Sequence, residues 1–334
     1  MENEFVQYTF CPIFKYLINR YFYPTNYFED PSFFIFKYSQ EEENKKKDLN
    51  LELHKDISKE YETNENRFNM IKNHINLNDN KENEKFTEND FIELQSIHSN
   101  SGISINLAIH IKTLYIFVIK KFQDIDIQHE IEFCDKYSHR CMTKFYGFIY
   151  KNENIVGFVY EYMSNGTLQD RMNKPINEIE SFTIINRIYQ AINYLHSNSL
   201  IHRDVKPNNI LFNHDNEAFL SDFDRIREVT DKEMTCDIGN IYYTSPEQDI
   251  NKDVSYPTDI FSFGLIVYFI FEKKELTESQ SLKEKRIEFP PMTKGPKSIQ
   301  NIYQKSVKLD QKRRITLKEI YDTLCKEAKE ITIF

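Results

Sequence analysis

The stretch HRDVKPNN, residues 202–209, gathers an Asp, a Lys and an Asn between two apolar runs. The preceding run, IESFTIINRIYQAINYLHSN, has apolar residues at helical spacing, and ILFN, which follows, has the composition of a buried strand. Pro207 prevents the helix from continuing through the stretch, because proline lacks an amide hydrogen and its ring clashes with the preceding turn. The sequence therefore predicts a polar loop held between two buried elements.

A second acidic cluster, LSDFDR with Asp222 and Asp224, lies downstream of this loop. Carboxylate and amide oxygens suit Mg²⁺, and a nearby lysine suits an anionic phosphate. Each of these residues alone would more often be a solvated loop charge, but the spacing of the whole set favours a site. Phosphoryl transfer is the class of reaction that uses all of these groups.

The amino-acid composition and the pattern of apolar residues change along the rest of the chain. We expect an aromatic-rich N-terminal segment at residues 1–38, a charged low-complexity linker at 39–90, and a folded domain from about residue 91. Strand-like runs begin that domain, with a hairpin turning at 151–154 and a helix near 124–137. Helical patterns dominate after Gly166. The order predicts a small sheet-rich lobe followed by a larger helical lobe.

Composition excludes several classes of function. The net charge is −9 and no dense basic tract is present, which makes a nucleic-acid partner unfavourable. The five cysteines are scattered without a C-x-x-C pair, a pattern typical of a reducing compartment. No run approaches the roughly 20 apolar residues of a membrane span. We therefore expect a cytoplasmic protein without a membrane-spanning segment.

HRDVKPNN matches the catalytic-loop pattern H-R-D-x-x-x-x-N, and through it the sequence resembles the eukaryotic protein kinases. Further motifs follow in the family's order: SDFD stands for D-F-G, SPE for A-P-E, TDIFSFG for D-x-x-S-x-G, and LDQKRRIT for a late D-x-x-x-R pattern whose Arg314 would pair with Glu247. The resemblance covers about residues 91–328. It implies an α+β, two-lobed fold: a five-stranded antiparallel sheet with one helix (91–161), then a mainly helical lobe (164–328), with nucleotide between them.

The same resemblance implies a role for each polar residue of the two clusters. Asp204 would accept or orient the proton of the substrate hydroxyl, and Asn209 and Asp222 would hold Mg²⁺. Lys206, two residues after Asp204, resembles the γ-phosphate lysine of serine/threonine kinases more than the tyrosine-kinase pattern. Because Arg203 precedes the aspartate, the loop could also accept a phosphate from the activation segment. Thr230 and Thr235 are candidate positions for that phosphate.

In the small lobe, FVIKK resembles V-A-I-K and indicates Lys120 as the lysine that holds the ATP phosphates, with Lys121 as an adjacent competitor. Its helical partner would be Glu130, with Glu132 as the alternative. FVYEYMSNGTL resembles the hinge between the lobes. The hinge residues are Glu161 and Met163, which would offer backbone groups to adenine, and the bulky Tyr160 at the gatekeeper position.

Two stretches depart from the family's pattern. The phosphate-covering loop G-x-G-x-x-G-x-V aligns with HSNSGISI, so that glycine positions hold His98, Asn100 and Ile103, Ile105 takes the valine position, and only Gly102 lies nearby. Side chains with a β-carbon obstruct close approach of backbone amides to phosphate, so we expect weaker ATP binding. Asp224 replaces the glycine of D-F-G, and it would either repel phosphate or, the favoured expectation, point to solvent.

Asn240 stands where serine/threonine kinases usually place a threonine, and it retains hydrogen-bonding capacity. The leading hypothesis is a serine/threonine protein kinase that uses ATP and Mg²⁺ on protein substrates in signalling. The alternative is a pseudokinase that acts as a binding or scaffold module. A small-molecule kinase is less favoured, because GNIYYTSPEQ resembles a peptide-docking segment. Residues 1–90 could bind a regulatory partner.

Overall fold

The structure is a computed structural model of the chain. It describes residues 84–100, 102–171, 174–229, 243–249, 254–274 and 289–331, all within one compact unit, Asn83–Phe334. The expected aromatic segment 1–38 lies outside the described residues, as do most of the linker, Thr230, Thr235 and Asn240. None of the helices in the described ranges is long and apolar enough to cross a membrane.

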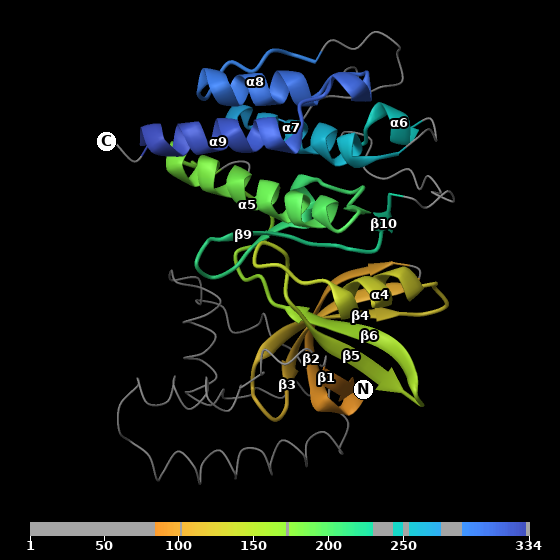
Figure 1. The fold of residues 1–334 in the computed structure, drawn as a ribbon. Coiled ribbons are helices and arrows are strands. Elements are labelled where there is room, and N and C mark those ends of the chain that lie inside the picture. Colours follow the sequence, from red (N-terminus) through yellow and green to blue (C-terminus); the bar gives the residue numbers. More distant parts are fainter. Residues whose placement is uncertain are drawn as a thin grey trace, which may run out of the picture. The chain divides into compact units, whose positions relative to one another are not determined.

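The first lobe is a six-stranded sheet with one helix on it (Figure 1). Its strands are β1 (Glu84–Thr87), β2 (Phe91–Asn100), β3 (Ile103–His110), β4 (Ile116–Phe122), β5 (Phe145–Lys151) and β6 (Asn154–Glu161), in the order β1-β5-β6-β4-β3-β2. The helix α4 (Gln128–Lys136) contributes Phe133 to a core shared with Phe148 and Phe158. The two-lobed α+β prediction is confirmed.

The lobe differs from the prediction in its first strand. Strand β1 pairs parallel with β5, whereas every other pair in the sheet is antiparallel. It lies in the stretch assigned to the charged linker, so strand structure is present from Glu84, before the expected boundary at residue 91. The reason is Phe86, which is buried and packs its ring 5.2 Å from that of Phe91. One apolar residue in EKFT is too weak a pattern to predict a strand.

The predicted hairpin at 151–154 is present between β5 and β6. Lys151 pairs with Asn154 across the turn, and both central residues, Asn152 and Glu153, have positive φ values of 49° and 67°. Two consecutive left-handed residues match the right-handed twist of the flanking strands. This turn returns the chain along β6 toward the second lobe.

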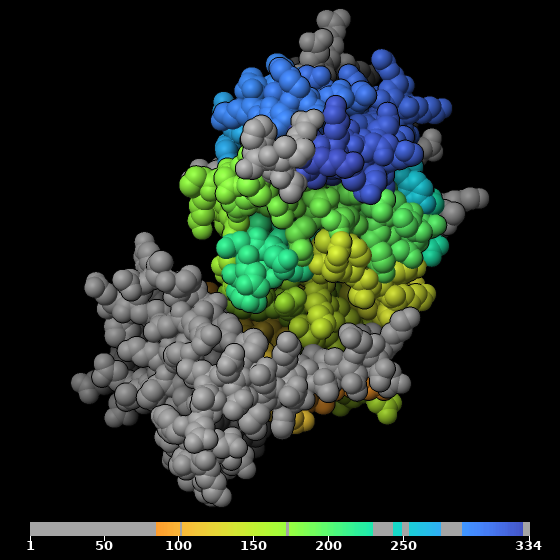
Figure 2. All heavy atoms as spheres, turned by 60° about the vertical axis from the view of Figure 1, so that its left-hand side comes forward, coloured from red at the N-terminus to blue at the C-terminus, as the bar shows by residue number. Residues whose placement is uncertain are grey.

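The second lobe is mainly helical. Its helices are α5 (Glu178–Ser197), α6 (Pro246–Asp249), α7 (Tyr256–Glu272), α8 (Lys297–Ser306) and α9 (Leu317–Ile331). The space-filling view shows α8 and α9, in blue, side by side (Figure 2). Helix α7 is buried on almost every side, which explains its nearly continuous apolar sequence. Gly264 lets it approach α8 closely, because a β-carbon there would lie 2.4 Å from Ser306 Cβ.

Short strands and 3₁₀ turns complete the fold. The strands are β7 (Leu200–Ile201), β8 (Ile210–Phe212), β9 (Ala218–Leu220) and β10 (Arg227–Glu228), and the turns are η2 (Glu88–Asp90), η3 (Pro207–Asn209) and η5 (Gln311–Arg313). The polar loop 202–209 runs from β7 through η3 into β8, as the sequence predicts. It is therefore held by buried elements at both ends.

Candidate active site

The two polar clusters meet because β8 and β9 form an antiparallel pair. Ile210 lies opposite Leu220, which places Asn209 beside Ser221 at the open end of the hairpin. The Ser221 amide and hydroxyl both donate to the Asn209 carbonyl, at 2.9 and 3.0 Å. The β8–β9 hairpin thus brings the loop 202–209 and the acidic cluster with Asp222 into one site.

Within the loop, two side chains converge on one carboxylate oxygen of Asp204. Asp204 Oδ2 accepts hydrogen bonds from Lys206 Nζ at 2.6 Å and from Asn209 Nδ2 at 2.9 Å. The same Asn209 nitrogen donates to the Asp204 carbonyl at 2.9 Å. Asp204 and Asn209 are buried, whereas Lys206 is partly exposed. The predicted catalytic residues are therefore one connected group.

Asp259 of α7 binds the backbone of this loop through its carboxylate. Its carboxylate accepts from the amides of His202 and Arg203, at 2.9 and 2.8 Å, and from His196 Nε2 at 2.8 Å. Burial acts to raise the pKa of Asp259, but these hydrogen bonds outweigh it and the pKa lies below its usual value. Arg203 is in the left-handed region (φ 70°), a strained conformation that this anchor stabilises.

The sequence motif D-x-x-S-x-G located Asp259 but did not reveal this contact. His202 and Phe223 also belong to motifs whose letters do not indicate the contacts that the two residues make. Both are buried, and their rings lie 6.1 Å apart, while Phe223 also packs 4.9 Å from Phe133 of α4. This aromatic row connects the loop to the small lobe.

In the small lobe the structure pairs Lys120, and not Lys121, with the helix. Lys120 Nζ donates to both oxygens of Glu130, at 2.9 and 3.0 Å, and lies 3.5 Å from Asp222 Oδ1. Lys121 points to the other face of β4 and pairs with Glu88 and Glu93. Strand alternation explains the choice, since neighbouring residues on a strand point to opposite faces. The alternative helical partner, Glu132, accepts instead from Gln128.

The charge of Lys120 is maintained by its surroundings. Burial acts to lower the pKa of Lys120, but the carboxylates of Glu130, Asp222 and Asp224 outweigh burial and raise it. Burial raises the pKa of Glu130, and Lys120 opposes that shift. A protonated lysine thus lies among the three carboxylates at the junction of the lobes.

The hairpin of β2 and β3 places side chains where the kinase pattern has glycines. His98 pairs with Ile105 and Ile105 pairs with Lys120, while Asn100 pairs with Ile103, which faces Phe122. Residues paired across neighbouring strands point to the same face of a sheet. The substituted positions therefore share the face of Lys120.

Gly102 lies in the turn of that hairpin. Its φ is +94°, and a β-carbon would lie 2.6 Å from Ile125 Cδ1 and 2.9 Å from the Gln123 carbonyl. The Gln123 amide also donates to the Gly102 carbonyl at 2.8 Å. This glycine is explained by the turn, since only glycine adopts that backbone conformation readily and fits that contact.

The expectation that Asp224 points to solvent is wrong. Its Oδ1 is fully buried and has no hydrogen-bond partner in the part of the chain that the structure describes. Burial and the charge of Asp222 raise the pKa of Asp224, and Lys120 acts in the opposite direction. Its φ is not in the left-handed region, so a side chain fits there without backbone strain. Asp224 therefore adds a carboxylate to the site itself.

The expected hinge follows the end of β6. The Glu161 amide donates to the Lys144 carbonyl at 2.9 Å, and Gly166 donates to the carbonyl of the buried Met163 at 3.4 Å. Burial raises the pKa of the Glu161 carboxyl. Tyr160 lies at the back of the site, where its hydroxyl donates to Glu130 Oε1 at 3.0 Å. Sequence reasoning located Tyr160 but missed this hydrogen bond.

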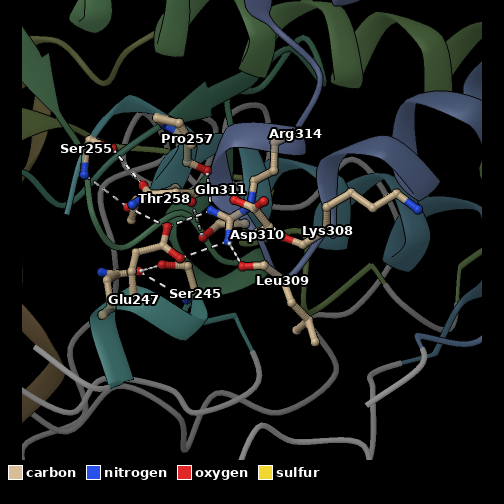
Figure 3. A network of polar contacts seen from close by, with 12 residues as sticks. Ser245, Glu247, Ser255, Pro257, Thr258, Lys308, Leu309, Asp310, Gln311 and Arg314 are labelled. Atoms are coloured by element: carbon tan, nitrogen blue, oxygen red, sulfur yellow. Dashed lines mark hydrogen bonds and ion pairs between the residues drawn. The ribbon is translucent and has the colours of Figure 1, made fainter. Parts of the chain in front are cut away.

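The ion pair implied for Arg314 and Glu247 is present and bidentate (Figure 3). Arg314 donates to the two carboxylate oxygens at 2.6 and 2.8 Å, and both residues are buried. Thr258 donates to Glu247 Oε1 at 2.9 Å, and Arg314 also donates to the carbonyls of Pro257 and Lys308. The pair links α6, the start of α7 and the segment before α9.

Comparisons with known proteins agree with this geometry. The chain is 29% identical over 186 residues to mitogen-activated protein kinase kinase 3 of Arabidopsis thaliana, covering 52% of this chain and 36% of that protein. It is 33% identical over 174 residues to the serine/threonine-protein kinase cst-1 of Caenorhabditis briggsae, covering 48% and 34%. It is 25% identical over 228 residues to the Aurora kinase of Saccharomyces cerevisiae, covering 63% and 62%.

The chain spans about a third of the length of the first of these relatives. The family model for the protein kinase domain matches residues 103–324, which is more than half of the chain and runs from β3 of the first lobe into α9 of the second. The ordered motifs of the sequence, the two-lobed architecture and the ion pair between Lys120 and Glu130 agree with that match. The chain therefore belongs to the protein kinase family.

Proposed function

We propose that this domain is a serine/threonine protein kinase that transfers the γ-phosphate of ATP to a hydroxyl of a protein substrate. The observation that carries the proposal is the convergence of two charged groups. Lys120, paired with Glu130, lies 3.5 Å from Asp222, and the β8–β9 hairpin brings Asp222 next to the Asp204 group. Such a set supports positioning and charge stabilisation, the main catalytic requirements of phosphoryl transfer.

Each residue has a role that its contacts support. Asp204 would orient the substrate hydroxyl and accept its proton, and Lys206 would neutralise charge on the transferred phosphate. Asn209 and Asp222 would hold the divalent metal. The Asn209 Nδ2 donates to Asp204, so the Asn209 Oδ1 would face a cation. The donor set of one carboxylate and one amide oxygen suits Mg²⁺, which keeps several waters. When bound, the metal neutralises charge on the nucleotide phosphates.

Lys120 would hold the ATP phosphates, and the hinge backbone at Glu161 and Met163 would bind adenine. His98, Asn100, Gly102 and Ile105 would cover the nucleotide from the hairpin, with weaker backbone contacts than a glycine-rich loop makes. The position of Lys206 supports serine and threonine as acceptors. A cytoplasmic location and a regulatory partner for residues 1–90 remain part of this proposal.

The test is phosphate transfer from radiolabelled ATP to a generic basic protein in the presence of Mg²⁺, followed by phosphoamino-acid analysis. The full-length chain is used. We expect label on serine or threonine. Label on tyrosine alone would contradict the assignment of the acceptor, and no label from folded protein would favour the alternative below.

The second candidate is a pseudokinase that acts as a binding module. It is favoured by two observations, the side chains of His98 and Asn100 on the face of Lys120 and the buried Asp224 oxygen in the site. Both features would weaken nucleotide binding. They leave the lysine, the catalytic aspartate and the metal-binding groups in place, which is why the active kinase is the first proposal.

Lys120→Met and its neighbour Lys121→Met form a matched pair for nucleotide binding. We expect ATP with Mg²⁺ at about 100 times the dissociation constant to stabilise the wild type and Lys121→Met by about 2.7 kcal/mol, a melting-temperature rise of several degrees. Lys120→Met should show no rise, because its methionine cannot pair with phosphate. Thermal unfolding with and without nucleotide measures this. An equal rise in both variants would exclude Lys120 as the phosphate ligand.

Asp224→Gly is expected to improve ATP binding. Removing a negative charge near the phosphate position should lower the KM for ATP roughly fivefold, or about 1 kcal/mol for a partly screened charge. Asp224→Asn, which keeps the shape, should give a similar change. Asp322→Asn, an exposed acid on α9, is the control and should leave KM unchanged. A KM that is unchanged or higher in both Asp224 variants would mean that this carboxylate does not oppose nucleotide.

A further inference from the structure

The Tyr160 hydroxyl makes contacts that the motifs do not account for. It donates to Glu130 Oε1 at 3.0 Å and lies 3.2 Å from Cys134 Sγ. Both partners belong to α4, whereas Tyr160 belongs to β6. Glu130 and Cys134 are four residues apart, so they lie on the same face of the helix, one turn from each other. One hydroxyl therefore connects the strand to two successive turns of α4.

The protons of these groups define the direction of the hydrogen bonds. Glu130 accepts from Lys120 with both oxygens, as an ionised carboxylate does, so the tyrosine must donate its only proton to Glu130. The Cys134 thiol must then donate to the tyrosine oxygen. Burial raises the pKa of both Tyr160 and Cys134, which keeps both groups protonated. In the series Cys134, Tyr160, Glu130 and Lys120, each hydrogen bond therefore has one donor and one acceptor.

The strand side of this connection is rigid. Tyr160 pairs with Val118 on β4 and Phe145 on β5, so it lies in the interior of the sheet. Its ring packs 5.5 Å from that of Phe145 and 6.2 Å from that of Phe158. On the helix side, α4 is nine residues long, and its first amide, that of Gln128, donates to Asp126 Oδ1 at 3.0 Å. A fixed hydroxyl thus restrains a short helix.

We propose that Tyr160 is a positioning residue, whose hydroxyl holds α4 in the orientation that presents Glu130 to Lys120. The effect on nucleotide binding rests on the proposed kinase function, whereas the restraint on α4 does not. A phenylalanine would fill the same space in the core and lose only the two hydrogen bonds. The tyrosine hydroxyl is therefore the group to remove.

The first test follows α4 directly, by hydrogen exchange of the full-length chain without nucleotide. Hydrogen bonds to charged groups contribute more to stability than bonds between neutral groups. We therefore expect the α4 amides to exchange about tenfold faster in Tyr160→Phe than in the wild type. The control is Tyr146→Phe, because the Tyr146 ring is packed against Phe117 but its hydroxyl forms no hydrogen bond with the described residues. Unchanged α4 exchange in Tyr160→Phe would overturn the proposal.

Cys134→Ala separates the two bonds of the hydroxyl. It removes the thiol but leaves the bond from Tyr160 to Glu130, so we expect a smaller increase in α4 exchange than in Tyr160→Phe. An equal or larger increase would show that packing of the thiol, and not the bond to Glu130, restrains the helix. That result would also overturn the proposal.

The second test measures ATP kinetics. If Glu130 is in position in only a fraction of the Tyr160→Phe molecules, the apparent affinity for ATP falls to that fraction of its value. Saturating ATP still shifts all molecules to the form that binds it. We expect KM for ATP to rise about tenfold with kcat nearly unchanged, and Tyr146→Phe to match the wild type. A fall in kcat at constant KM would indicate loss of folded protein and contradict the proposal. If the wild type binds no ATP, the kinase function fails, and the exchange experiment still decides the role of Tyr160.

Discussion

Asp204→Asn is expected to reduce phosphate transfer at least a thousandfold. The asparagine keeps the size of the side chain and its place beside Asn209, but it cannot take a proton from the substrate hydroxyl. Lys206 also loses the carboxylate that it contacts at 2.6 Å. Proton transfer alone contributes about 10²–10⁴-fold, and the loss of charge around the transferred phosphate adds to it. Initial rates of labelled phosphate incorporation measure the change.

The matched control for this change is Asp215→Asn, an exposed acid in the turn between β8 and β9. It should keep the wild-type rate. Thermal unfolding with ATP and Mg²⁺ should show that Asp204→Asn still folds and still binds nucleotide. If incorporation continued at more than a tenth of the wild-type rate, Asp204 would not be the catalytic carboxylate.

Arg314→Ala is expected to lower the free energy of unfolding by about 3–5 kcal/mol, because it leaves Glu247 buried without its partner. Burial acts to raise the pKa of Glu247, and at present Arg314 outweighs burial and lowers it. The change also leaves the carbonyls of Pro257 and Lys308 without the guanidinium donor. For a domain of this size the melting temperature should fall by roughly 10 °C. Thermal or denaturant unfolding of the full-length chain measures it.

Two further variants separate the ion pair from general effects. Arg313→Ala, the exposed neighbour, should change the stability by less than about 0.5 kcal/mol. Arg314→Met combined with Glu247→Gln should be less destabilising than the sum of the single changes, since it removes both charges together. A loss below about 1 kcal/mol in Arg314→Ala would mean that the pair contributes little to this lobe.

Much of the site follows from short-range spacing. The interval between Asp204 and Asn209 and the position of Pro207 predict the polar loop between buried elements, and the structure has it there. Alternation along FVIKK separates Lys120 from Lys121, which the structure places in different ion pairs. The hairpin at 151–154 follows from its turn residues in the same way.

The predictions that differ from the structure, and a contact of Tyr160 that the sequence does not indicate, concern residues whose surroundings come from distant parts of the chain. Strand β1 depends on the pairing of Phe86 with the β5 strand, not on its own weak pattern. One carboxylate oxygen of Asp224 is buried near charges that include Lys120 of the small lobe, which no pattern in DFD could show. The Tyr160 hydroxyl donates to Glu130, which is 30 positions away in the sequence.

The sequence by itself determined the order of the motifs, the identity of the chemical groups, and the faces on which strand and helix periodicity present them. These depend on backbone geometry that repeats every few residues. Tertiary structure alone decided contacts that no motif implies: Lys120 and Asp222 are 102 positions apart, and Tyr160 and Glu130 are 30 apart. Such contacts depend on how buried elements pack together, and side-chain volume and hydrogen-bond satisfaction select that packing only when the whole core is assembled.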